Sequence, residues 1–171
     1  PEVPTAVRKE ILVDAFERLA KIPDGFHANA KVLKVIEQRR DKVLAGQGFD
    51  WGTAEHAAFA SLLLEGRRIR LSGQDARRGT FTHRHACLFD TQTGERYTPL
   101  ESLNSGNFQV YDSPLSEAGV LGFDYGYSLD CPDGLVIWEA QFGDFANSAQ
   151  VIIDQFIVSA EDKWLRLSGL V

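Results

Sequence analysis

Three side chains in the C-terminal half of the sequence are of the types that could hold a flat, nitrogen-containing ring. Glu117 lies just after a strand-like segment, and Gln141 and Phe145 follow the next such segment. A carboxylate beside a ring nitrogen can exchange a proton with it, while an aromatic face can stack on the ring plane. Ligands of α/β proteins bind at the carboxyl ends of the strands. The spacing therefore predicts a ring-binding cleft there, with Glu117 as its acid.

Glu117 also has a structural interpretation. In Ser113-Pro114-Leu115-Ser116-Glu117, Ser113 could cap a helix and Pro114 could occupy the first helical position. Glu117 would then lie near the positive end of the helix dipole, where a negative charge is stabilising. A capped helix is also a rigid platform for a catalytic acid, so both interpretations stay open.

The segment after the later strand has the same ambiguity. Phe142 and Phe145 could pack in the core, while Asp144 or Asn147 caps the next helix. In the functional interpretation, Gln141 and Phe145 contact the ring instead. The residue types alone do not separate these two interpretations.

The hydrophobic pattern predicts helices first, and then strands that alternate with helices. Five segments have apolar residues at helical spacing, namely residues 5–20, 28–44, 50–64, 115–129 and 146–160. Four short apolar runs predict strands at 69–72, 108–111, 135–138 and 167–171. Thr53 could cap the third helix. This order favours an α/β fold with a parallel sheet and right-handed crossovers.

The connection between the first two strands, residues 74–103, is too long for a tight turn. A turn at 90–94 between two short extended runs predicts a hairpin within it. His83 and His85 form a His-x-His pair, but no third ligand follows nearby, so we expect no metal site. These residues would instead order a loop, face a subunit interface or line the access route of an anionic substrate.

Length, charge and composition limit the classes of protein to which the chain can belong. A chain of 171 residues is long enough for one domain, and its net charge of -6 with no basic stripe argues against binding nucleic acid. No apolar run approaches the roughly 20 residues of a membrane helix. Two cysteines, Cys87 and Cys131, without CxxC spacing favour a reduced, intracellular protein. Because the chain lacks Met and stops in a strand-like run, we expect a piece of a longer polypeptide.

Residues 49–171 resemble the pyrimidine-binding domain of the thiamin-diphosphate-dependent 2-oxoglutarate dehydrogenase E1 family. The resemblance is carried by several blocks in one order, namely FDWGTAE (49–55), LSGQDARRGTF (71–81), RHA (84–86), YTPL (97–100), DSPLSE (112–117), IWEAQFGDFAN (137–147) and VIIDQF (151–156). Ala76 departs from the family, which commonly has Ser there. The resemblance implies a parallel sheet with helices on both faces, truncated at its C-terminal end. Residues 1–48 would be a helical leader segment.

The resemblance also implies roles for four residues. Glu117 would be the catalytic carboxylate that hydrogen-bonds the aminopyrimidine N1′ of thiamin diphosphate. Phe145 would stack on that ring, while Leu115 and Gln141 would line its pocket. The Mg²⁺ and diphosphate would be bound by a separate domain that this sequence lacks.

By the same resemblance, the full-length protein would decarboxylate 2-oxoglutarate oxidatively in the tricarboxylic acid cycle. It would work as a homodimer and pass the succinyl unit to the lipoyl domain of an E2 succinyltransferase. It would be cytoplasmic in a bacterium or in the mitochondrial matrix of a eukaryote. This chain alone, with half of a cofactor site, would be inactive. Two alternatives stay open: an E1 that acts on 2-oxoadipate, and a non-catalytic interaction or dimerisation module of the same fold.

Overall fold

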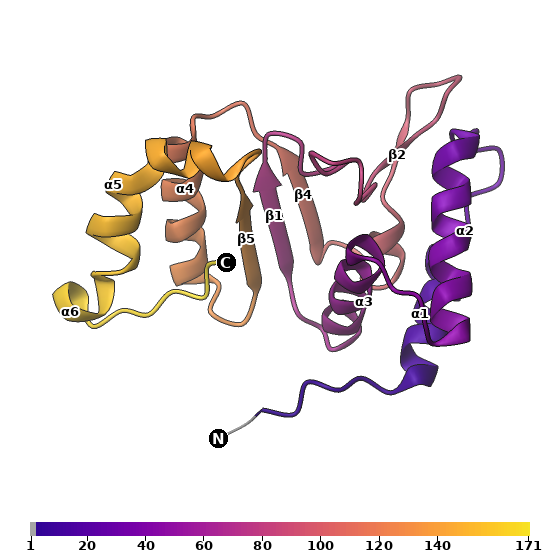
Figure 1. Ribbon diagram of the computed structural model, residues 1–171, viewed down its shortest axis with the longest axis horizontal. Coiled ribbons are helices and arrows are strands. Elements are labelled where there is room, and N and C mark those ends of the chain that lie inside the picture. The colour runs from indigo at the N-terminus through magenta and orange to yellow at the C-terminus, as the bar shows by residue number, and fades with distance from the viewer. Residues whose placement is uncertain (1–2) are drawn as a thin grey trace.

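The computed structural model describes residues 3–171 and has a three-stranded parallel sheet with helices on both faces (Figure 1). β1 (Ile69–Gly73) lies at the centre of the sheet, between β4 (Phe108–Asp112) and β5 (Leu135–Glu139). The register pairs Gly73 with Asp112 on one side and with Glu139 on the other. The three strands therefore end at the same level, and the predicted α/β fold is confirmed.

The remaining elements surround this sheet. Before it come α1 (Lys9–Leu19), α2 (Ala30–Ala45) and α3 (Trp51–Leu64). The connection from β1 to β4 contains the antiparallel pair β2 (Leu88–Phe89) and β3 (Arg96–Tyr97), followed by the 3₁₀ turn η1 (Pro99–Ser102), so the predicted hairpin is confirmed. After β4 come α4 (Glu117–Asp130), β5, η2 (Gly143–Ala149), α5 (Gln150–Ile152), η3 (Ile153–Ile157) and α6 (Ala160–Trp164).

Successive side chains of β1 point to opposite faces of the sheet. Ile69 and Leu71 are fully buried in the main hydrophobic core, which also contains residues of α1 and α3. Arg70 and Ser72 point the other way and bond to Asp124 of α4. Because successive side chains of a strand point to opposite faces, α3 and α4 cover opposite faces of the sheet.

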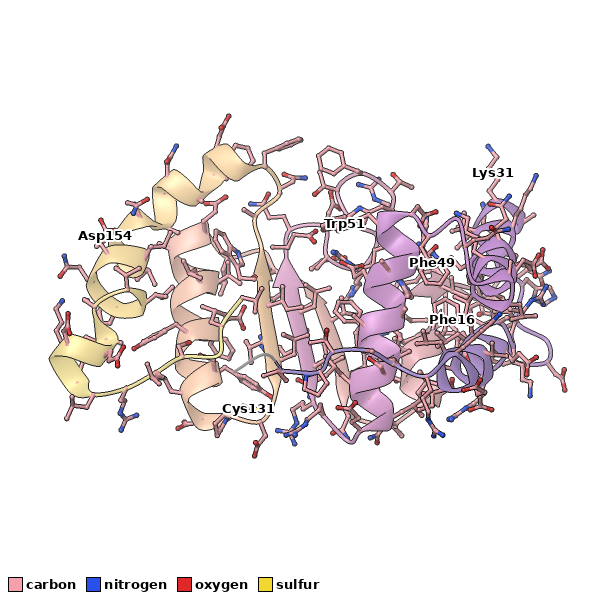
Figure 2. The ribbon with its side chains drawn as sticks, turned by 60° about the horizontal axis from the view of Figure 1, so that its bottom comes forward. Phe16, Lys31, Phe49, Trp51, Cys131 and Asp154 are labelled. Carbon is pink, nitrogen blue, oxygen red and sulfur yellow. The ribbon has the colours of Figure 1, made fainter. Side chains whose placement is uncertain are left out.

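The leader helices are part of this core. Phe16 of α1 is 2% exposed and belongs to the same cluster as Phe59 of α3 (Figure 2). α3 lies between α1 and the sheet, which explains why it is rich in Ala and Leu on all sides. Among residues 3–171, no helix combines the length and the apolar character that crossing a membrane requires.

On the opposite face, α4 is held by a buried ion pair. Asp124 has no exposed surface and accepts a hydrogen bond from Arg70 Nε at 2.7 Å and another from Ser72 Oγ. The Arg70 guanidinium carbon lies 4.6 Å from the ring centroid of Tyr111, and 5.0 and 4.9 Å from those of Phe123 and Tyr127. Three aromatic faces and one carboxylate therefore compensate this charge for its loss of water.

Two helix starts differ from the sequence prediction. α4 begins at Glu117 with Ser116 as its N-cap, whose side chain accepts from the Gly119 N–H, so the predicted cap Ser113 was wrong. Ser113 instead accepts from Leu115 N–H at 3.3 Å in the turn before the helix. α3 is capped by Asp50 rather than by the predicted Thr53. In both cases two suitable capping residues stand near each other, and their types do not decide between them.

The last predicted helix and strand are also more broken than expected. Residues 146–160 form 3₁₀, α and π turns in succession rather than one α-helix. Apolar residues stay on one side of such a segment in all three windings, so periodicity does not distinguish them. The strand predicted at 167–171 is reduced to one parallel bridge, which joins Leu170 to Val136 of β5.

We predict that Asp124→Ala lowers the free energy of unfolding by about 3–5 kcal/mol, because it leaves the Arg70 charge buried without its carboxylate. Urea unfolding of the chain, followed by circular dichroism, measures this change. Asp130→Ala is the matched control, since Asp130 is exposed at the other end of the same helix and its loss should matter by less than about 0.5 kcal/mol. Equal stability of the two variants would contradict the prediction.

Candidate functional site

Glu117 stands at the carboxyl end of the sheet, on the first residue of α4. Its side chain is half-buried and is contacted by hydrogen-bond donors from two other loops. Gln74 Nε2 donates to Oε1 at 3.3 Å, and Ser148 Oγ lies 2.9 Å from Oε2. Among the described residues, no ion pair includes Glu117. A carboxylate can accept about four hydrogen bonds, so this one keeps acceptor capacity for a ligand.

Ser148 ties Glu117 to the segment that bears Phe145. Its Oγ lies 2.9 Å from Glu117 Oε2 and also 2.9 Å from the backbone oxygen of Phe145. A hydroxyl group has one proton, so it donates to only one of these oxygens at a time. Ser148 therefore links the Glu117 side chain to the backbone of Phe145, whichever of the two oxygens receives its proton.

The loop after β1 connects Glu117 with Gln141. Gln74 donates to Glu117, and the next residue, Asp75, accepts from Gln141 Nε2 at 3.0 Å. Asp75 also accepts from Arg78 Nη2 at 3.1 Å. Since β1 is the central strand, this loop lies between the loops that follow β4 and β5. Two of the predicted residues, Glu117 and Gln141, are therefore brought together through Gln74 and Asp75.

Aromatic side chains lie exposed beside these polar groups. Phe145 and Phe142 are 40% and 48% exposed, so the alternative that both pack in the core was wrong. Their ring centroids are 5.7 Å apart at 89°, and Phe142 meets Phe81 at 6.1 Å and 83°. Asp144 and Asn147 make no capping bond to η2. Exposed rings at a strand end are typical of ligand or partner contacts rather than of a core.

Leu115 is the one predicted residue that does not join this set. Its side chain is 50% exposed and lines a separate hollow of about 240 Å³, together with Arg70, Tyr111 and Phe123. This hollow lies at the end of β4, on the face of the sheet covered by α4. The structure thus brings Glu117, Gln141 and Phe145 to one place and leaves Leu115 beside it.

A hollow of about 390 Å³ adjoins Gln141. Its lining combines aromatic and polar residues, namely Trp51, Thr80, Phe81, His83, Glu139, Ala140 and Gln141. Trp51 lies at the N-terminal end of α3, near the carboxyl ends of the strands (Figure 2). The volume is at the lower end of the roughly 300–1,000 Å³ that small-molecule sites occupy. The hollow is large enough for a small organic ligand beside Gln141.

Below this hollow, one buried arginine is shared by two carboxylates. Arg84 is 2% exposed and donates to both Glu55 oxygens, at 2.8 Å from Nε and 2.7 Å from Nη2. It also donates from Nη1 to Glu139 at 3.1 Å and to the backbone oxygen of Ala76 at 2.9 Å. Burial alone would lower the pKa of the Arg84 guanidinium, but the two carboxylates outweigh burial and raise it. α3, the loop after β1 and the end of β5 are thereby joined.

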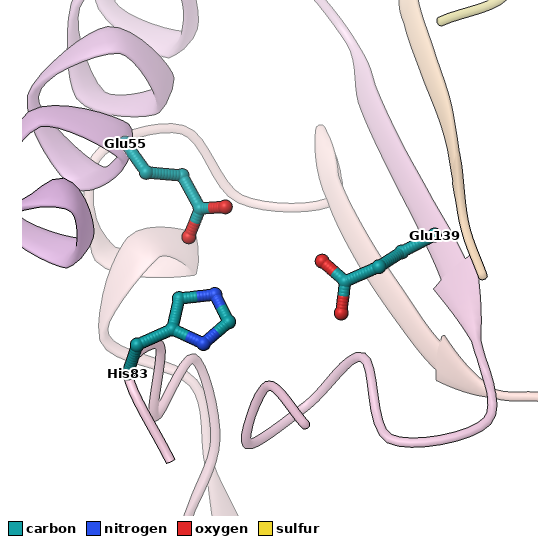
Figure 3. Close-up of side chains that lie close together, drawn as sticks. All are labelled: Glu55, His83 and Glu139. Carbon is teal, nitrogen blue, oxygen red and sulfur yellow. The ribbon is translucent and has the colours of Figure 1, made fainter. Parts of the chain in front are cut away.

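His83 completes this cluster, as Figure 3 shows. Possible ligand atoms of Glu55, His83 and Glu139 lie within 4.8 Å of one another. The guanidinium of Arg84 already pairs with both carboxylates, so its positive charge offsets one of their two negative charges and its N–H groups occupy their oxygens. We interpret it as an ion-pair cluster that fixes the loop bearing His83.

That loop has a strained backbone. Thr82 and His85 have positive φ values of 58° and 50°, which is uncommon for residues other than glycine and an outlier for a β-branched one. Gly79, at φ 80°, approaches the His83 ring so closely that a Cβ atom would lie 2.4 Å from its Cε1. Such strain persists only where the surroundings over-determine the conformation, and it occurs most often at functional sites.

Several residues of the site were missed by sequence reasoning. Gln74 and Asp75 could have been found, because they directly follow the central strand, whose end must lie beside the ends of its neighbours. Ser148 lies one turn after Phe145 and could also have been considered. The pairing of Arg84 with Glu55 and Glu139 joins residues 29 and 55 positions apart, and no local pattern indicates it.

Comparisons with known proteins show which family the chain resembles. The family of the transketolase pyrimidine binding domain matches residues 47–171. Proteins named 2-oxoglutarate dehydrogenase E1 component from Oceanobacillus iheyensis and Rickettsia conorii are each 54% identical over 169 residues, which is 98% of this chain and 18% of theirs. A mitochondrial 2-oxoglutarate dehydrogenase from Saccharomyces cerevisiae is 49% identical over 173 residues, 17% of its length. The chain thus spans less than a fifth of these relatives.

We predict that Gly79→Ala destabilises the chain more than Gly94→Ala, by about 1–3 kcal/mol beyond the conformational cost that both share. Both glycines have positive φ, but a Cβ at Gly94 would meet nothing within 4 Å, whereas one at Gly79 would meet the His83 ring. The shared cost of a left-handed alanine is about 1–2 kcal/mol. Urea unfolding of both variants measures the difference, and an equal loss would show that the His83 ring moves freely.

Proposed function

The chain belongs to the family of the transketolase pyrimidine-binding domain, and we propose that it is this domain of a 2-oxoglutarate dehydrogenase E1 component. We further propose that residues 1–48 form a helical leader and residues 49–171 the domain itself. The names and identities of the relatives, which match 98–100% of the chain, support the assignment to an E1 component. The same names favour 2-oxoglutarate over 2-oxoadipate as the substrate of the full-length protein.

In this proposal the chain supplies the aminopyrimidine half of a thiamin diphosphate site. Glu117 hydrogen-bonds N1′ of the ring, Phe145 stacks on it, and Gln141 lines the pocket, while Leu115 lines its edge from the adjoining hollow of about 240 Å³. The proposal is supported by the fit of the donor set: a half-buried carboxylate with free acceptor capacity, next to two exposed aromatic rings. Thiamin diphosphate, when bound, supplies the carbanion chemistry that decarboxylates a 2-oxoacid.

The chain's own residues would contribute position and a proton. Glu117 holds or moves a proton at N1′, which favours the imino form of the pyrimidine. Ser148 supports both states of this carboxyl group, because its hydroxyl can donate to the carboxylate or accept from the acid. Gln74 holds the carboxyl group near the loop after β1 by its hydrogen bond to Oε1.

The remainder of the function depends on parts outside this chain. We propose that Mg²⁺ and the diphosphate are bound by another domain, and that the complete site lies at the interface of a homodimer. The dimer would pass the succinyl unit to the lipoyl domain of an E2 succinyltransferase. It would lie in the bacterial cytoplasm or in the mitochondrial matrix, according to its source. The isolated chain would bind half of the cofactor and turn over no substrate.

A non-catalytic interaction module is the alternative from another class. Such a module could keep Glu117 for the helix dipole alone, but it would have no need for the donors Gln74 and Ser148 that hold the carboxylate in place. The single observation that carries the catalytic proposal is therefore Glu117 itself, hydrogen-bonded to donors yet without an ion-pair partner among the described residues.

We predict that Glu117→Gln in the full-length enzyme lowers kcat for 2-oxoglutarate decarboxylation by about 10²–10⁴-fold, because an amide cannot exchange a proton with N1′. Ferricyanide reduction measures this step without E2. Circular dichroism and gel filtration should show an unchanged fold and dimer. Glu161→Gln, on the exposed surface of α6, is the control and should leave kcat unchanged. A Glu117→Gln enzyme with normal turnover would eliminate the catalytic proposal.

A further inference from the structure

A second buried arginine, Arg39, contacts the backbone of the strained loop. Arg39, on α2, is 5% exposed. Its Nη1 donates to the backbone oxygen of Arg84 at 2.8 Å, and its Nη2 donates to the backbone oxygen of His83. Among the ion pairs of the described residues, none includes Arg39. This guanidinium is thus committed to the backbone of residues 83 and 84.

Burying a charge without a carboxylate is unfavourable, and the surroundings show how it is compensated. Burial lowers the pKa of Arg39, while the more distant charges of Asp50 and Glu55 counteract this effect. The backbone oxygens of His83 and Arg84 are the negative ends of the carbonyl dipoles, and they stabilise the Arg39 charge locally. A buried charge held in this way costs stability compared with an apolar side chain, so its presence calls for a role other than packing.

His56 fixes the orientation of the Arg39 guanidinium. Its Nδ1 lies 3.0 Å from the Gly52 oxygen, which can only accept, so Nδ1 carries the proton and Nε2 is free to accept. Nε2 lies 3.4 Å from Arg39 Nη1. Burial, with the nearby Arg39 charge, lowers the pKa of His56 to about 3, which keeps the ring neutral at physiological pH. A neutral ring in this tautomer accepts from Arg39 rather than repelling it.

Gly52 leaves the space that this arrangement requires. A Cβ at this position would lie 2.3 Å from the His83 backbone oxygen and 2.9 Å from Arg39 Nη2. Helix α3 therefore allows the loop to approach its first turn and to receive the guanidinium there. Arg39 lies before the 47–171 stretch matched by the family, so the contact joins the leader segment to the domain.

The loop supplies part of the lining of the hollow beside Gln141, which explains why its backbone is held so firmly. Thr80, Phe81 and His83 form one wall of the hollow of about 390 Å³, and Gln141 also lines this hollow. A shift of the His83 backbone would move this wall directly, whereas Glu117 and Phe145 are held by other elements, α4 and η2.

We propose that Arg39 is a positioning residue: its guanidinium holds the backbone of His83 and Arg84 so that the 80–83 wall faces the ring-binding residues in the geometry that the 2-oxoacid reaction needs. This proposal rests on the proposed function for its kinetic consequence. Helix α2 of the leader segment thereby fixes the shape of the hollow, although none of its side chains is among the residues that line the hollow.

Arg39→Ala in the full-length enzyme tests the proposal, with Arg40→Ala as the matched control. Arg40 is the next residue on α2, and within residues 3–171 its side chain bonds only to Asp41. We expect Arg39→Ala to lower kcat/KM for 2-oxoglutarate by about 10- to 100-fold through misplacement of the wall. The half-saturating concentration of thiamin diphosphate should change by less than about twofold, because the ring contacts are intact. Arg40→Ala should leave both quantities at wild-type values.

Hydrogen–deuterium exchange of the amides of residues 77–86 reads the loop directly. The N–H groups of Arg84 and His85 both donate to the Arg78 oxygen, so they report whether the loop is closed. We expect their exchange to accelerate by about tenfold or more in Arg39→Ala, as in local opening, and to stay unchanged in Arg40→Ala. Unchanged exchange in a folded, dimeric Arg39→Ala enzyme would overturn the proposal. So would a parallel loss of cofactor and substrate affinity.

Gly52→Ala provides a second variant if Arg39→Ala does not fold. Alanine favours the helix more than glycine does, so any loss cannot be assigned to a weaker α3. Its Cβ should displace the His83 backbone and reproduce the same separation between substrate and cofactor effects. Wild-type kinetics in Gly52→Ala would count against the proposal. If the wild-type enzyme did not decarboxylate 2-oxoglutarate, the proposed function would fail, while the exchange measurement would still decide whether Arg39 holds the loop.

Discussion

The carboxyl edge of the sheet, where the candidate site lies, depends on one interaction: two carboxylates share one buried guanidinium. Arg84 joins Glu55 of α3, Glu139 at the end of β5 and the backbone after β1. These segments are far apart in sequence, and without a common partner the two carboxylates would repel each other. The pairing brings the first turn of α3 against the sheet at the height where the strands stop. The hollow beside Gln141 is therefore walled by segments with one shared electrostatic anchor.

The sheet register complements this anchor. Because the three parallel strands end at the same level, the residues that follow each strand meet along one edge. Glu117 follows β4, Gln141 follows β5, and Gln74 with Asp75 follows β1 between them. The side chains that meet there need only short polar contacts to connect. The leader helices support the same edge from outside through the core they share with α3.

The sequence predicted the parts of this architecture that local patterns encode. The positions of the strands and of the first four helices follow from apolar spacing, and the residues expected to be functional lie after the ends of the strands. What could not be predicted depends on tertiary contacts. Asp50 rather than Thr53 caps α3, and the segment after Phe145 winds irregularly, because neighbouring elements select among locally similar options. The partners of Arg39 and Arg84 lie up to 55 residues away, and no periodicity records them.

The central place of β1 has a consequence for the newborn chain. β1 is translated before both of its neighbours, and β5 ends at residue 139, 66 positions after the end of β1 at residue 73. At roughly 5–20 residues per second, about 3–13 s of synthesis pass before the second edge of β1 can be paired. During that interval α1, α2 and α3 can already cluster, while β1 still has an unpaired hydrogen-bonding edge. Ribosome-bound chaperones would bind the chain with its unpaired strand during this interval, and slowly translated codons between the hairpin and β5 would lengthen the interval.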